Sequence, residues 1–339
     1  MIDVLVVGGG PVGLASALYC QRAGLTVRVL EQRAGPIDKA CGEGLLPAAV
    51  RALAELGVRP AGWDLTGIRY LNPRHSVDAR FRHGVGRGVR RTELHSALCS
   101  AVLGVGIVVD QRRVAEVSQH DGSISAGGVR ARYLIAADGL HSPIRRQLGL
   151  EQPSRRAPRW GQRQHFAVAP WTDLVEVHWG TDAEAYVTPT GPGQVGVALL
   201  SARRQPFEQL LRGFPRLLER LPVGAPGAGV LGAGPLRQRV IGRVAGRVLL
   251  VGDAAGYVDA LTGEGLSIGL LTAQRLAACL AADRPAAYER AWRQQTRRYR
   301  TLTEALILAA GNRASRSLIV PAAARLPSLF SSIVNQLAR

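Results

Sequence analysis

The chain has 339 residues, 47% hydrophobic and 20% charged, and its 43 Lys and Arg residues outnumber its 25 Asp and Glu residues to give a net charge of +18. This composition excludes an intrinsically disordered chain and a collagen-like fibre, and the length suits two domains or one large α/β domain with an insertion. Lys39 is the only lysine, and the arginines form short pairs without interleaved aromatic residues, so we expect no nucleic-acid partner.

Cysteine usage and hydropathy predict a cytoplasmic protein. The four cysteines lie far apart, without metal-binding spacing, so we expect free thiols and no metal site (Cys20, Cys41, Cys99 and Cys279). No basic-then-apolar leader precedes the first apolar run, and no apolar stretch approaches the roughly 20 residues of a membrane span.

The first 31 residues have the pattern of a dinucleotide-binding βαβ unit. Residues 4–7 predict a buried parallel strand, residues 14–23 a helix, and residues 25–30 a second strand that ends at Glu31. The glycine turn between the first strand and the helix would let the chain turn tightly, approach a diphosphate and pack the helix closely (Gly8, Gly10 and Gly13). Glu31 stands where an acidic side chain accepts hydrogen bonds from a ribose.

Two later strands also end in acidic residues. Residues 132–139 end in Asp138-Gly139, and residues 247–253 end in Gly252-Asp253. A glycine-rich turn at 262–265 then precedes a helix with one apolar face. Carboxylates at strand ends can hold ribose or ribityl hydroxyls, and a helix N-terminus can stabilise the negative charge of a reduced flavin.

Together, these blocks resemble the FAD-binding fold of the flavoprotein aromatic hydroxylases (the p-hydroxybenzoate hydroxylase class) and of the geranylgeranyl reductases, over about residues 1–300. The resemblance implies an α/β fold with a Rossmann-like FAD-binding domain of the glutathione-reductase type at 1–70, 88–150 and 235–300. An inserted antiparallel β-sheet would bind the substrate (71–87 and 151–234), as the alternating residues 176–179, 185–189 and 195–199 also indicate. Residues 301–339 would form a C-terminal helical cap.

The same resemblance implies which residues contact FAD. Arg91 matches an Arg-x-x-Leu segment that touches the cofactor, Asp253 the acid on the ribityl chain, and 263–265 the turn beneath the pyrimidine side of the flavin. The complete expected set is Gly8, Gly10, Pro11, Val12, Gly13, Glu31, Gln32, Arg33, Cys41, Gly42, Arg91, Val114, Asp138, Gly252, Asp253, Gly263, Glu264, Gly265 and Leu266.

The segment 39–45 resembles the Lys-x-Cys-Gly segment of the geranylgeranyl reductases. It is either a flexible loop that places Cys41 at the flavin edge or a turn with an inert cysteine. The chain departs from the hydroxylases at Gly256-Tyr257 and Ala260-Leu261, where a His and prolines are common. It also lacks the reductases' longer Tyr-and-Trp motif and the Trp-x-Trp motif of flavin halogenases.

The resemblance implies a monooxygenase of secondary metabolism that uses a flavin hydroperoxide to hydroxylate or epoxidise a lipophilic aromatic, polyketide or isoprenoid-like molecule. The alternative reaction is reduction of an isoprenoid double bond. A third hypothesis is a flavin-binding module without turnover, such as a redox sensor. A second Gly-x-Gly-x-x-Gly after a strand is absent from the sequence. We therefore expect electrons from transiently bound NAD(P)H or from a flavin reductase partner.

The sequence nominates few reactive side chains. Cys41, Tyr186 and Arg237 are the candidate catalytic residues, and His75, His83, His178 and Tyr186 are the candidate bases for a phenolic substrate. Residues 301–339 mix apolar and arginine positions, which is typical either of a cap over the cavity or of an amphipathic segment in peripheral contact with a membrane. The sequence does not indicate an oligomeric state.

Overall fold

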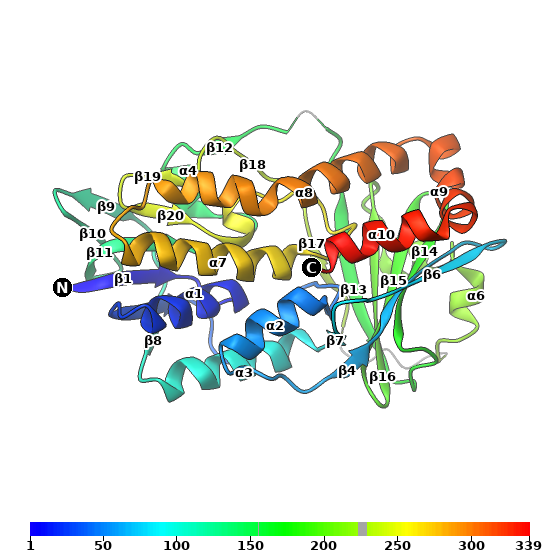
Figure 1. The fold of residues 1–339 in the computed structure, drawn as a ribbon, viewed down its shortest axis with the longest axis horizontal. Helices are drawn as coiled ribbons and strands as arrows, with labels where there is room; N and C mark the ends of the chain where they lie inside the picture. The colour runs from blue at the N-terminus through cyan, green and yellow to red at the C-terminus, as the bar shows by residue number, and fades with distance from the viewer. Residues whose placement is uncertain (155, 223–228) are drawn as a thin grey trace.

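The chain folds around two large β-sheets that lie at opposite ends of an elongated molecule (Figure 1). A computed structural model describes residues 1–154, 156–222 and 229–339. Residues 155 and 223–228, which belong to the predicted substrate-binding sheet, lie outside the described residues. The N-terminus lies at the far end of the first sheet, whereas the last residues lie where the two halves meet (Figure 1).

The first sheet has the parallel core of a Rossmann-type fold. Its main strand order is β19-β20-β11-β1-β2-β8; in addition, β10 pairs with β11, and β9 pairs with β10. Strand β1 pairs in parallel with both β2 and β11. The strands are β1 (Ile2–Val7), β2 (Val27–Glu31), β8 (Val108–Gln111), β9 (Val117–His120), β10 (Ser123–Ala126), β11 (Val129–Ala136), β19 (Val244–Ala245) and β20 (Val248–Leu250).

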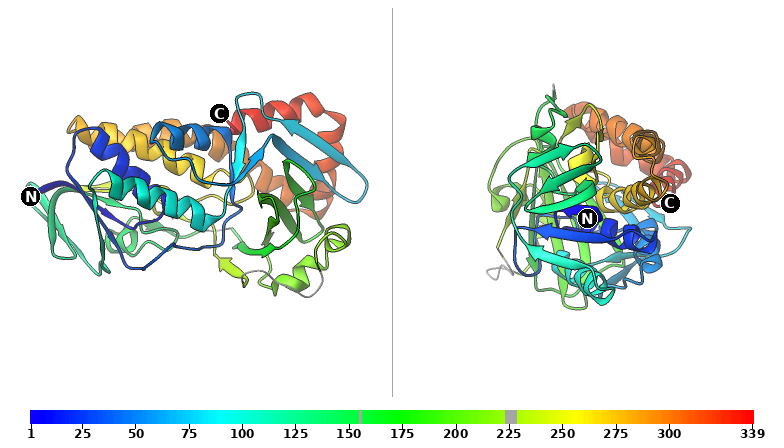
Figure 2. Two further views of the ribbon diagram at one scale, coloured as in Figure 1. Left: turned by 90° about the horizontal axis from the view of Figure 1, so that it is seen from below. Right: turned by 90° about the vertical axis from the view of Figure 1, so that its left-hand side faces the viewer.

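Helices cover this sheet, and α1, α3 and α7 place their N-termini at its carboxyl edge. Helix α1 begins at Pro11, three residues before the predicted start, because proline is well tolerated at the first helical position. The helices α7 and α8 lie together along one side of the molecule (Figure 2). The helical elements of this half are α1 (Pro11–Arg22), α2 (Pro47–Glu55), α3 (Arg91–Gly104), α4 (Pro143–Gln147), the 3-10 turn η1 (Gly252–Ala255), α7 (Gly265–Ala281) and α8 (Ala287–Ala310). The predicted α/β fold is thereby confirmed.

The second sheet differs from the predicted one in two respects. Its strand order is β17-β13-β16-β15-β14-β5-β6, and β5 pairs in parallel with β14, so the sheet is mixed rather than antiparallel. It also takes in residues from Gly67, ahead of the predicted boundary at 71. A parallel pair needs a long crossover connection, and no local pattern reveals it. The strands are β5 (Gly67–Leu71), β6 (Ser76–Arg80), β13 (Trp160–Phe166), β14 (Leu174–Trp179), β15 (Ala183–Gly191), β16 (Gln194–Ser201) and β17 (Leu231–Ala233).

Smaller elements lie outside the two large sheets. A three-stranded sheet has the order β3-β7-β4, and a two-stranded one pairs β12 with β18. These elements are β3 (Gly44–Leu45), β4 (Trp63–Leu65), β7 (Gly86–Gly88), β12 (Glu151–Gln152), β18 (Arg239–Val240), α5 (Phe207–Leu211) and α6 (Pro215–Leu218).

The C-terminal helices α9 (Arg313–Arg325) and α10 (Pro327–Leu337) pack on β6. Asn335 binds the outer edge of that strand: its Oδ1 accepts from the Arg82 backbone N–H at 2.7 Å, and its Nδ2 donates to the Arg80 carbonyl at 2.9 Å. Among the described residues, no single helix has the length and apolarity of a membrane span. Only α9 and α10 taken together have this length and apolarity, and the two helices are bent by 102° relative to each other.

Candidate active site

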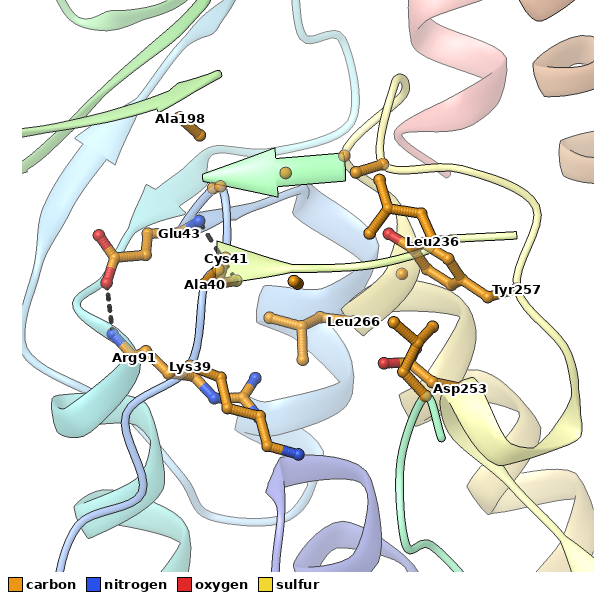
Figure 3. A pocket seen from close by; sticks show the side chains of 18 of the residues that line it. Lys39, Ala40, Cys41, Glu43, Arg91, Ala198, Leu236, Asp253, Tyr257 and Leu266 are labelled. Carbon is orange, nitrogen blue, oxygen red and sulfur yellow. Dashed lines mark hydrogen bonds between the residues drawn. The ribbon is translucent and has the colours of Figure 1, made fainter. Parts of the chain in front are cut away.

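One cavity of about 630 Å³ runs from the glycine turn of the first sheet to the second sheet and the C-terminal helix. Its wall combines residues that are distant in the chain, such as Gly10, Asp138, Tyr186, Asp253 and Val334. Figure 3 shows Lys39, Cys41, Asp253 and Leu266 around the same space. The fold thus brings three of the predicted sequence blocks, and the segment that contains Cys41, to one place.

The three glycines of the turn have different structural roles. A Cβ on Gly13 would lie 1.9 Å from the Gly8 carbonyl oxygen, and Gly8 has a φ of +107° with its Cβ position 2.3 Å from the Ala137 oxygen. Both positions therefore require glycine for the fold itself. Gly10 and Gly13 both line the cavity, but only Gly10 has free space at its Cβ position, where the nearest atom is Nη2 of Arg91, at 3.9 Å. The space over Gly10 is open to a ligand.

Glu31 holds the turn in place from the end of β2. Its Oε2 accepts the Gly9 N–H at 2.7 Å, and its Oε1 accepts the Arg33 N–H at 3.0 Å. Pro11, Val12, Gln32 and Arg33 line the cavity, whereas Glu31 is absent from its described wall. Val114 lies outside this wall too, packed against the core of the first sheet.

The strand-end carboxylates face a group of cations. Burial raises the pKa of Asp253, while the neighbouring charges of Lys39, Arg91 and Arg145 oppose that rise. Asp138 accepts the Ile144 N–H at 3.1 Å through Oδ2, and its buried Oδ1 has no partner among the described residues. The open Gly10 turn, the adjacent Arg91 guanidinium and the unpaired Asp138 oxygen suit a ligand with a diphosphate and several hydroxyls, and therefore fit FAD.

The turn before α7 exposes its glycines to the cavity but not its carboxylate. Gly252, Gly263, Gly265 and Leu266 line the cavity, as do Cys41 and Gly42. The Glu264 side chain is not part of the described wall; it is 3% exposed, and burial raises its pKa well above the ordinary value. Contact between Glu264 and a cofactor would therefore go through its backbone.

The structure separates the candidate catalytic residues. Cys41 and Tyr186 line the cavity, and the Tyr186 hydroxyl donates to the Leu261 carbonyl at 2.7 Å. Arg237 pairs with Glu304 and lines a separate pocket of about 30 Å³, so it does not face the main cavity as the sequence suggested. The three candidate histidines also lie outside the described wall: His75 and His83 are exposed, and His178 is 3.3 Å from Glu176.

Sequence reasoning missed two groups that support the site. His95 on α3 lies with its Nε2 2.9 Å from the Gly9 carbonyl, directly behind the glycine turn. Arg163 and His165 on β13 reach Glu43 and the neighbouring loop. Because Arg163 and His165 are two residues apart on a strand, they lie on the same face of the sheet. The sequence could therefore predict that these two side chains are neighbours, but not that they meet Glu43.

Asp259, next to the cavity turn, is expected to make stability depend on pH. Burial raises its pKa to about 6, the nearby Glu184 adds to this, and Arg159 at 3.5 Å opposes it. The native carboxyl thus binds its proton more tightly than the unfolded one, so its contribution to stability is complete below pH 4 and is lost as the pH rises through about 6.

Asp259→Asn removes this titration. The free energy of unfolding would be measured with urea between pH 4 and 7. As the pH rises, we expect this free energy to fall for the wild type relative to the variant. Asp121→Asn, at an exposed turn, is the matched control. Parallel pH profiles for wild type and Asp259→Asn would contradict the assignment.

Comparison with known proteins agrees with this geometry. The family described as FAD binding domain matches residues 1–76 and 105–214. A menaquinone reductase of Mycobacterium tuberculosis (strain ATCC 25618 / H37Rv) is 32% identical, over 81% of this chain and 75% of the relative. A para-nitrophenol 4-monooxygenase of Pseudomonas sp. (strain WBC-3) is 30% identical, over 82% of this chain and 77% of the relative.

The fold also has solved counterparts. The crystal structure of a geranylgeranyl bacteriochlorophyll reductase-like protein from Thermoplasma acidophilum superposes with a TM-score of 0.76 at 22% identity, over 89% of this chain and 87% of that one. The matched family covers more than half of the residues, and the relatives include both reductases and monooxygenases. The chain therefore belongs to the FAD-binding-domain family, and it is an FAD-dependent oxidoreductase.

Proposed function

We propose that this oxidoreductase saturates a carbon–carbon double bond in a lipophilic, isoprenoid-like substrate, the second of the two reactions that the sequence predicts. The observation that carries the proposal is the largely apolar wall that the second sheet contributes to the cavity that Cys41 also lines. Its apolar side chains include Ile68, Tyr70, Val175, Val177, Ala198 and Leu200, and Leu65 of β4 lines the same cavity. Such a wall suits a hydrocarbon chain. The relative named menaquinone reductase also supports a reduction.

Bound and reduced FAD would supply the hydride that adds to one carbon of the double bond. The Cys41 thiol would donate the proton that the other carbon needs, so that the two hydrogens added are one hydride and one proton. Burial raises the pKa of this thiol and keeps it protonated until the transfer. The thiolate left behind would be stabilised by Arg91 and Arg163 and by the Glu43 N–H, 3.4 Å from Sγ, and would regain its proton from water.

Hydroxylation of a phenol calls for a base that accepts the phenolic proton, and the four bases that the sequence nominated are poorly placed for that role. His75, His83 and His178 lie outside it. Tyr186 does line the cavity, but its hydroxyl donates to a carbonyl, and burial raises its pKa well above the ordinary value. A protonated phenol is a weak base, so none of these four residues supports the monooxygenase reaction, and His141, which also lines the cavity, is the remaining imidazole in the described wall.

The mass of the product distinguishes the two reactions. Purified protein loaded with FAD would be reduced by NAD(P)H, or by a flavin reductase, in the presence of a polyprenyl lipid without oxygen. We expect the product to gain two hydrogens, and to gain the same mass in air. A product that gains one oxygen atom, formed only in air, would overturn the proposal in favour of the monooxygenase.

A further inference from the structure

We propose that Glu43 is a positioning residue that connects the cofactor side of the cavity to the substrate-binding sheet. It does so through a chain of hydrogen bonds from Arg163 and His165 on β13 to the first residue of α3. The proposal depends on FAD binding and does not depend on which reaction follows.

The backbone of Glu43 has a conformation that is uncommon for a residue with a side chain. Its φ is +58°, in the left-handed region. The Val89 N–H donates to the Glu43 carbonyl at 2.8 Å, and the Glu43 N–H donates to Cys41 Sγ at 3.4 Å. This conformation turns a fully buried carboxylate toward two donors on different elements. Non-glycine residues in this region often mark sites where the surrounding structure fixes the chain for function.

The carboxylate takes the place of a helix cap. Its Oε1 accepts the N–H of Arg91, the first residue of α3, at 2.9 Å. The residue that precedes the helix, Arg90, makes no side-chain cap hydrogen bond. The free N–H groups at a helix start need an acceptor, and a negative charge is favourable there. Glu43 supplies both from 48 positions away in the chain.

The hydrogen-bond directions follow from the chemistry of the partners. Nη1 of Arg163 is 3.0 Å from Nδ1 of His165, and Nε2 of His165 is 2.6 Å from Oε2 of Glu43. Arginine can only donate, so Nδ1 accepts and the ring proton is on Nε2, which donates to the carboxylate. Glu43 therefore accepts from two fixed donors, and only a carboxylate offers an acceptor to each.

Arg163 ties the same strand to the start of the loop. Its guanidinium, 1% exposed, forms an ion pair with Asp38 and donates to the Lys39 carbonyl at 3.3 Å. The loop 38–43 is thus held at both ends from β13. The paired groups of this buried network fix the loop in one arrangement, although Nε of Arg163 has no hydrogen-bond partner among the described residues.

This arrangement controls side chains that face the cofactor. Figure 3 shows the bond between Glu43 and Arg91, with Lys39 and Cys41 on the same part of the wall. Arg91 lies beside Gly10, where the diphosphate approaches. A displaced Glu43 would move the start of α3 and, with it, the Arg91 guanidinium. We therefore expect FAD affinity to depend on Glu43 although its carboxylate need not touch FAD.

Glu43→Gln tests the proposal with almost no change of volume. The NH₂ group of the glutamine must face either the Arg91 N–H or the Nε2–H of His165, and in both cases two donors meet. If the ring proton of His165 moves to Nδ1, the same clash of two donors arises between Nδ1 and Arg163. We expect the Kd for FAD to rise about tenfold, a change of about 1.4 kcal/mol in binding free energy. The visible circular dichroism of the bound flavin should also change.

Two substitutions of His165 complete the test. In His165→Gln, the amide oxygen can accept from Arg163 and the amide NH₂ can donate to Glu43, so FAD affinity and the flavin spectrum should stay near those of the wild type. His165→Leu cannot do either and should resemble Glu43→Gln.

A purely structural role would give a different result: lower melting temperatures, with unchanged FAD affinity and flavin spectrum in the protein that remains folded. That result, or equal damage in His165→Gln and His165→Leu, would overturn the proposal. These measurements need no substrate. A protein that binds FAD but fails to reduce a double bond would contradict only the proposed function.

Discussion

Gly10→Val is expected to yield a folded protein that no longer retains FAD. Gly10 has φ −68° and ψ 170°, a conformation open to any residue, and only Arg91 Nη2 comes within 4 Å of its Cβ position. The added side chain would therefore fill the space that a diphosphate needs without disturbing the protein. We expect FAD binding to weaken at least a hundredfold, or by about 2.7 kcal/mol, in absorbance titrations.

Gly13→Ala is the matched comparison within the same turn. Its Cβ would overlap the Gly8 carbonyl oxygen, so this variant should be destabilised in the absence of FAD as well. By contrast, Gly10→Val should melt close to the wild-type apoprotein, apart from about 1 kcal/mol for a poorer helix cap. Retention of FAD by Gly10→Val at wild-type affinity would refute the placement of the diphosphate.

Cys41→Ala is expected to reduce kcat for double-bond reduction by about 10² to 10⁴, the usual contribution of a positioned acid. FAD content and KM should change little, because the thiol is proposed to act only when the second carbon is protonated. The alanine variant removes the proton donor and leaves the loop, which is held through Glu43 and through the bond from Thr188 to the Gly42 carbonyl.

The pH profile gives a second test of the same residue. A thiol must be protonated to act as an acid, so the wild-type rate should fall as the pH rises through the raised pKa of Cys41. Cys41→Ser keeps a side chain of similar size whose hydroxyl is a much weaker acid than the thiol. The rate of this variant should be low and should not decline at alkaline pH. An unchanged kcat in Cys41→Ala would assign the proton to another donor.

The sequence predicted the parts of the site that are formed by residues close to one another in the chain. The glycine turn and the acidic strand end at Asp253 each belong to one strand and its following turn, where local geometry determines the role, whereas Glu31 binds the turn from outside the described wall. Because βαβ units have a fixed handedness and their strands end at one edge, these segments also imply that the blocks meet.

The remaining features depend on long-range contacts. His165 and Glu43 are 122 positions apart, and the parallel pairing of β5 with β14 joins segments about 100 residues apart. For the same reason the sequence left open whether Arg237 lines the cavity or ends a strand in solvent, since its partner Glu304 is on α8, 67 positions away. The alternation of residues along a strand indicates which face of the strand is polar. Only the three-dimensional structure shows which charged side chains from other elements pack against that face.

The two hydrogen bonds of Asn335 have a consequence for self-association. An open strand edge offers its backbone to other molecules, and natural proteins often block such edges to prevent aggregation. By binding the Arg80 carbonyl and the Arg82 N–H, α10 covers the end of β6, while Val334 and Leu337 of the same helix line the cavity. A change that detaches this helix would therefore both open the binding chamber to water and leave a strand able to recruit a neighbouring molecule.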